Sequence, residues 1–93
     1  MANFAVTLNF ADDTETRHSV RPTHREYLKT LLDAGSLVQS GPFTDDSGAL
    51  LIYEAADLPA AEALLAADPY TLNGGIIASS TIKEWNIVMS KYS

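Results

Sequence analysis

Hydrophobic and polar residues alternate strictly over Phe4–Phe10. This period of two predicts a half-buried β-strand, with one row of side chains facing a core. The polar, turn-rich segment Ala11–Val20 predicts a loop. Apolar residues then recur at helical spacing, and we expect a helix that opens at Arg21-Pro22-Thr23 and ends at Gly35. Proline suits a first helical turn, and glycine suits the position after the last one.

The rest of the chain predicts a second helix between further strands. Asp57 is a suitable N-cap for this helix. Asp68-Pro69 should end it, because a residue before proline is disfavoured in the α region. The expected strands are Leu37–Ser40, stopped by Gly41-Pro42, then Ala49–Glu54, the short Ile76–Ala78 and Thr81–Met89; the expected loops are the hairpin Thr44–Gly48 and Tyr70–Gly75.

The resulting order, β-α-β-β-α-β, is that of the ferredoxin-like split βαβ fold. We therefore expect one α+β domain over residues 1–93, with an antiparallel sheet in the order 4-1-3-2 and both helices on one face. The third and last predicted strands carry apolar residues on both sides, which a sheet with one solvated face does not need. A second copy packed sheet to sheet about a two-fold axis would cover them, forming a homodimer. Scattered surface apolar residues are the alternative.

Composition narrows the function classes without naming one. The 93 residues carry 12 acidic and 6 basic side chains, for a net charge of −6, which disfavours a surface for nucleic-acid phosphates. With no cysteine, disulfides, thiolate nucleophiles and zinc–sulfur sites are excluded. The apolar runs are far shorter than the roughly 20 residues that span a bilayer. We expect a cytoplasmic protein that uses no cofactor. We also expect no metal site, because Asp45-Asp46 lacks the other ligands of a calcium loop.

His24 and Asp68 are the candidate catalytic residues. If strands and helices alternate in direction, the start of the first helix and the end of the second lie at the same end of the molecule. His24 shares the inward helical face of Tyr27 and Leu28. A carboxylate beside an imidazole fixes its tautomer and leaves the other ring nitrogen free to move a proton. The alternatives are a structural histidine and a turn-forming aspartate.

Helix dipoles should favour this pair, because His24 is expected at a positive helix end and Asp68 at a negative one. Arg21 is placed either to hold an anionic ligand or to pair with an acidic residue of the preceding segment. His18 is expected to be solvated in the loop before the first helix.

An ordered set of motifs resembles the YciI-like (YCII-related) family: Arg21-Pro22-Thr23-His24, Ser40-Gly41-Pro42 and Asp68-Pro69-Tyr70. The resemblance runs from about Arg21 to Trp85. It implies a ferredoxin-like fold in a dimeric α+β barrel and a His–Asp active-site pair at His24 and Asp68. It also implies a pocket whose substrate-binding residues are Arg21, Ser40, Gly41, Pro42 and Tyr70. The family's group includes a dehydrochlorinase of chloroaromatic degradation, and related dimeric barrels include muconolactone isomerases.

These observations favour a cofactor-free enzyme. His24 would act as general base or acid, oriented by Asp68, in a lyase-, isomerase- or dehydrochlorinase-like step on a small organic acid. One alternative is a non-catalytic dimer that binds a small ligand in the same groove. Another is a purely structural pair that ties the two helices together.

Overall fold

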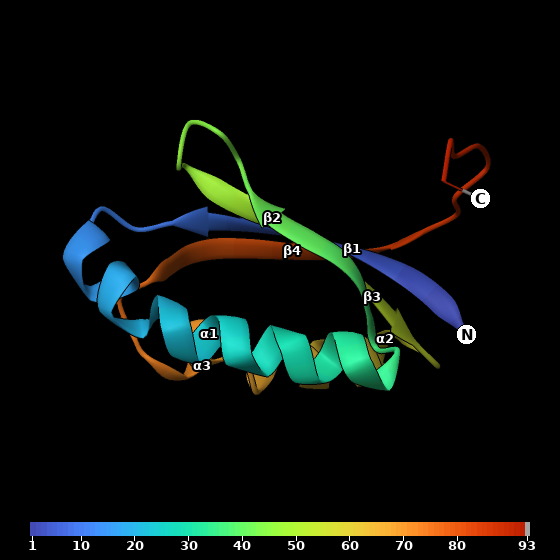
Figure 1. The fold of residues 1–93 in the computed structure, drawn as a ribbon, viewed down its shortest axis with the longest axis horizontal. Coiled ribbons are helices and arrows are strands. Elements are labelled where there is room, and N and C mark those ends of the chain that lie inside the picture. Colours follow the sequence, from blue (N-terminus) through green and yellow to red (C-terminus); the bar gives the residue numbers. More distant parts are fainter. Residues whose placement is uncertain (93) are drawn as a thin grey trace.

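Four antiparallel strands form one sheet in the order β2-β3-β1-β4, and the helices pack on one of its faces (Figure 1). The computed structural model describes residues 1–92. Its elements are β1 (Ala2–Phe10), α1 (Thr14–Ala34), β2 (Leu37–Pro42), β3 (Gly48–Ala55), α2 (Leu58–Ala66), α3 (Pro69–Leu72) and β4 (Ile77–Trp85). The predicted α+β class, ferredoxin-like order and placement of the helices on one face are confirmed.

The core lies between the sheet and the helices. The alternating residues Phe4, Val6 and Leu8 of β1 are buried there, as the period of two predicts. Leu28 of α1 and Leu65 of α2 reach the same core from the helix layer. The helices therefore present to the sheet the faces that their apolar spacing indicated. Within residues 1–92, no helix combines the length and the apolar character that crossing a membrane requires.

The start of α1 corrects the sequence analysis, since this helix begins at Thr14 and not at Arg21. The Asp13 carboxylate accepts from the Thr16 backbone N–H at 3.1 Å and from the Thr16 hydroxyl at 2.6 Å, which makes it the N-cap. Pro22 lies inside the helix. It removes one backbone donor there, and the turns before it are held by the cap and by contacts of Arg17 with other segments. The C-terminus is as expected, with Gly35 in the left-handed conformation at φ +83°.

Three further boundaries differ for reasons of pairing and capping. β2 continues through Gly41-Pro42, which pair with β3; β2 is an edge strand, where a proline needs no partner for its missing N–H. Ile77–Trp85 is one continuous strand, and Asn86–Met89 lie beyond the sheet. Because Trp85 pairs with Asn3, almost no β1 residue remains for them. The expected loop after Asp68 contains the short helix α3.

Candidate functional site

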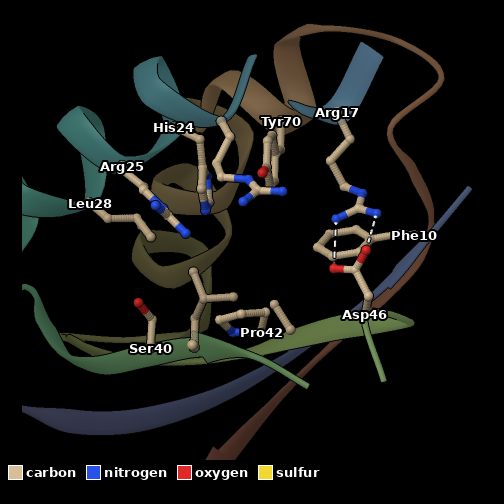
Figure 2. A pocket seen from close by; sticks show the side chains of 13 residues that line it. Phe10, Arg17, His24, Arg25, Leu28, Ser40, Pro42, Asp46 and Tyr70 are labelled. Atoms are coloured by element: carbon tan, nitrogen blue, oxygen red, sulfur yellow. Dashed lines mark hydrogen bonds and ion pairs between the residues drawn. The ribbon is translucent and has the colours of Figure 1, made fainter. Parts of the chain in front are cut away.

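A cavity of about 260 Å³ lies between α1, α3 and the β2–β3 hairpin (Figure 2). Its wall combines apolar and aromatic side chains with arginines and a histidine. The structure places six of the seven predicted site residues in this wall: Arg21, His24, Ser40, Gly41, Pro42 and Tyr70. The seventh, Asp68, is fully buried and contacts His24. The order of the elements and the packing of α1 against α3 bring these separated segments to one place.

The His24–Asp68 contact is short and shielded from water. His24 Nδ1 lies 2.7 Å from Asp68 Oδ1, and the two side chains are 9% and 0% exposed. Asp68 Oδ1 also accepts from the backbone N–H of Tyr70 at 2.9 Å, so the same carboxylate is the N-cap of α3. Because a carboxylate accepts from Nδ1–H, the other ring nitrogen, Nε2, is left free for exchange with a ligand. Figure 2 shows the His24 ring directed from α1 toward the cavity.

Tyr70 fixes the plane of the imidazole. Its ring stacks on that of His24 with centroids 3.8 Å apart and planes 3° from parallel. Phe10 in turn contacts Tyr70 edge to face, with centroids 5.8 Å apart. Burial raises the pKa of the Tyr70 hydroxyl, against the opposing effect of the Arg21 and Arg17 charges. Tyr70 is therefore a neutral stacking partner at physiological pH.

The helix dipoles do not bring the pair together, contrary to the expectation above. His24 lies well inside α1, so the partial positive charge of the helix N-terminus at Thr14 is several turns away. Asp68 lies between α2 and the N-terminus of α3, where its carboxylate is favoured. The packing of α1 against α3 and the cap at Asp68 place the two groups instead.

A second ion pair closes the cavity on the hairpin side. Arg17 donates to Asp46 through both terminal nitrogens, at 3.0 and 2.8 Å, and its guanidinium lies 4.4 Å from the centre of the Phe10 ring. The Arg17 hydrogen bonds lower the pKa of Asp46. Asp45, the other half of the supposed calcium fragment, accepts from the Ser47 N–H and hydroxyl. Within residues 1–92, no three His, Asp or Glu side chains gather closely enough to hold a metal.

The sequence analysis missed Phe10, Arg17, Arg25 and Asp46 as residues of the cavity wall. A signal for two of them was present, because the chain's arginines recur every four residues and so share one helical face. The spacing of Arg21 and Arg25 already lay within the expected helix, whereas Arg17 joins this face only because the helix begins at Thr14, where we expected a loop. His18, which we also expected in that loop, is an exposed residue of α1.

Two tyrosines lie near the pair, Tyr53 buried and Tyr27 partly buried. The Tyr27 hydroxyl donates to the Leu64 carbonyl at 2.5 Å. The Tyr53 hydroxyl and Asp68 Oδ2 are buried and, within residues 1–92, make no hydrogen bond. Burial raises the pKa of Tyr53 far above its ordinary value, and the nearby Asp68 carboxylate adds to this effect. Both phenols are therefore neutral groups around the carboxylate.

The comparisons with known proteins identify the family of the chain. The family model for the YCII-related domain matches residues 2–86. Curated relatives named Protein YciI, from Escherichia coli O6:H1 and Shigella flexneri, are each 40% identical over 74 residues, which is 69% of this chain and 76% of each relative.

A solved structure is similar in fold. It is the 5-chloro-2-hydroxyhydroquinone dehydrochlorinase of Burkholderia phenoliruptrix in complex with 2,5-dihydroxybenzoquinone. The TM-score is 0.78 at 23% sequence identity, over 90% of this chain and 93% of that chain. By the family match and the identity to the curated relatives, the chain belongs to the YCII-related family.

Proposed function

We propose that this protein is a small-molecule enzyme in which His24 transfers a proton as general base and acid, oriented by Asp68. The observation that carries the proposal is the 2.7 Å contact between His24 Nδ1 and Asp68 Oδ1 at the wall of a cavity. The carboxylate directs the imidazole and stabilises the imidazolium that forms when Nε2 takes a proton. The stacked Tyr70 ring prevents the imidazole from turning out of the geometry that proton transfer needs.

The reaction class that fits is a lyase- or isomerase-type step on a small organic acid. His24 Nε2 removes a proton from a C–H or O–H group, and the electron pair of that bond forms a new double bond in the substrate. In an isomerisation, the imidazolium returns the proton to another atom. In a dehydrochlorinase-like step, a C–Cl bond breaks and chloride leaves with its electron pair. The dehydrochlorinase of similar fold supports this second form.

The substrate-binding residues in this proposal are Arg21, Ser40, Gly41, Pro42 and Tyr70, all in the cavity wall. The β2 segment from Ser40 to Pro42 forms the wall across from α1, as Figure 2 shows for its two end residues. Non-catalytic binding of a small ligand in the same cavity is the competing function. The arginine-rich wall supports it, because such a wall holds an anion whether or not a reaction follows.

Replacement of His24 by Gln tests the proposed reaction. The first substrate is 5-chloro-2-hydroxyhydroquinone, with chloride release as the readout. We expect His24→Gln to lower kcat/KM by about 10²–10⁴-fold, the usual contribution of a positioned general base, and Asp68→Asn to lower it as well. His18→Gln is the matched control, because it removes an exposed histidine of α1 that does not line the cavity. Ligand binding without turnover in the wild type would support the binding function, and unchanged kcat/KM in both site variants would end the proposal.

We also propose that two copies pair through the open face of the sheet. Leu50 and Trp85 occupy this face by their register with β1 and are 39% and 43% exposed. Leu50 also lines a shallow groove with Phe43 and Ile52. A Leu50→Lys substitution should shift the sedimentation coefficient from that of a dimer to that of a monomer, whereas a wild-type monomer would refute the pairing. A cytoplasmic location remains a prediction.

A further inference from the structure

All of the arginines in this chain line the same cavity. Arg17, Arg21 and Arg25 follow one another along α1 at intervals of four residues, which places their side chains on one face of the helix. The other basic residues, all lysines, lie outside the cavity wall. A chain with a net charge of −6 thus concentrates its guanidinium groups around one small space.

Only one of the three guanidiniums is neutralised. Arg17 is paired with Asp46, the sole carboxylate in the wall. Within residues 1–92, neither Arg21 nor Arg25 is in an ion pair. Asp68, the other carboxylate nearby, is fully buried behind His24 and is engaged by it. The wall therefore carries an excess of two positive charges, since Asp46, which is paired with Arg17 and also attracts Arg21, can balance only one of the three guanidiniums.

The remaining wall is largely apolar. Leu28, Leu51 and Phe10 line the cavity together with Pro42. Arg25 extends from α1 toward the β2 wall, where Figure 2 shows Ser40 and Pro42. With a volume of about 260 Å³, the space lies just under the ~300–1,000 Å³ usual for small-molecule sites. Such a cavity suits a body no larger than about one ring.

We propose that the ligand of this cavity is a small dianion, with a ring-sized apolar body and two separate anionic groups. One anionic group binds Arg21 and the other binds Arg25, each through the planar fork of the guanidinium, which matches a carboxylate. Arg21 and Arg25 flank His24 in sequence, so the two-point attachment presents the body of the ligand to the imidazole. The inference rests on the proposed function only for the role of His24, and the charge recognition stands apart from any reaction.

The test is isothermal titration calorimetry with benzene-1,2-, 1,3- and 1,4-dicarboxylate, compared with benzoate, benzamide and inorganic phosphate. The dicarboxylates vary the spacing of the two charges, and phosphate supplies two charges without an apolar body. We expect the best dicarboxylate to bind about tenfold to a hundredfold more tightly than benzoate, the effect of one further charge-assisted hydrogen-bonded pair.

Arg25→Gln and Arg21→Gln should each abolish most of this preference. Lys29→Gln is the matched control, since it removes one positive charge from the next turn of α1 without touching the cavity wall. The proposal is overturned by equal binding of benzoate and the dicarboxylates, by phosphate binding as tightly as the best dicarboxylate, by equal losses in Lys29→Gln and Arg25→Gln, or by no binding of any dicarboxylate in the millimolar range.

The same titrations on His24→Gln separate this inference from the proposed function. We expect the dicarboxylate preference to persist in this variant, because Arg21 and Arg25, and not His24, bind the two carboxylates of the ligand. If the preference persists while turnover is insensitive to His24→Gln, the anion recognition stands and the proposed proton transfer fails. If turnover depends on His24 and no dicarboxylate preference exists, the proton transfer stands and the dianion is wrong.

Discussion

Two aspartate contacts beside the cavity, His24–Asp68 and Arg17–Asp46, have nearly the same length, but their carboxylates have very different surroundings. His24–Asp68 spans 2.7 Å and Arg17–Asp46 spans 2.8 Å, and in both pairs the partner of the aspartate comes from α1. The Asp68 side chain is 0% exposed, whereas that of Asp46 is 53% exposed. The contact distance alone therefore does not show which of the two contacts contributes more to stability. Water can reach the Asp46 carboxylate, although its partner Arg17 is only 4% exposed, whereas nothing in the core can replace the partners of Asp68.

This difference assigns different roles to the pairs. The buried pair holds an imidazole in one orientation, which is what proton transfer requires. The half-exposed pair joins the start of α1 to the β2–β3 hairpin, so it influences how firmly the hairpin covers the cavity. Three predictions test the contrast.

The largest effect is expected for Asp68→Ala. This substitution removes the partner of His24 and the acceptor of the Tyr70 N–H, both buried, and breaking a buried pair costs about 3–5 kcal/mol. Urea unfolding measures the loss. Asp57→Ala is the matched control, because Asp57 caps α2 through the Ala60 N–H and contacts no histidine, and a cap alone is worth about 1 kcal/mol. Equal losses in the two variants would show that burial of the His24 pair contributes nothing.

A smaller effect is expected from the two tyrosines near Asp68, the partly buried Tyr27 and the buried Tyr53. Tyr27→Phe leaves the Leu64 carbonyl without its donor and should lower the free energy of unfolding by about 1–3 kcal/mol. Tyr53→Phe removes a buried hydroxyl that makes no hydrogen bond within residues 1–92, so the free energy of unfolding should stay the same or rise. A clear destabilisation by Tyr53→Phe would mean that its hydroxyl supports Asp68, and the contrast between the tyrosines would fail.

The smallest effect is expected for the Arg17–Asp46 pair, whose carboxylate is half exposed, and it depends on pH. The pKa of Asp46 is lower in the folded protein than its ordinary value of about 3.9. Its contribution to stability is therefore complete above that ordinary value and is lost as the pH falls through the folded-state pKa. Asp46→Asn and Arg17→Met should each remove the same acid-dependent part of the urea midpoint. A double variant that loses the sum of the two single effects would show that the groups are not coupled.

Much of the fold follows from local patterns, and the exceptions have identifiable causes. The alternation in Phe4–Phe10 and the boundaries at Gly35 and Asp57 depend on neighbouring residues, so they were predictable. Pro22 was misleading, because proline usually lies in a first helical turn, whereas this helix begins after the Asp13 cap and holds Pro22 in its interior. The residues after Trp85 have the composition of a strand but no partner strand to pair with.

The candidate site divides in the same way. The sequence by itself predicted that the segments carrying His24 and Asp68 lie near each other, because chain direction and element order follow from local patterns. It did not place His24 correctly along its helix: His24 lies in the middle of α1 and not at its start, so the packing of α1 against α3 decides the contact. Only the tertiary structure decided that Tyr70 stacks on the imidazole, that Arg17 reaches Asp46, and that two further arginines face the cavity unpaired. These are contacts between side chains far apart in the chain, and their geometry depends on how α1, α3 and the hairpin pack, which no local spacing encodes.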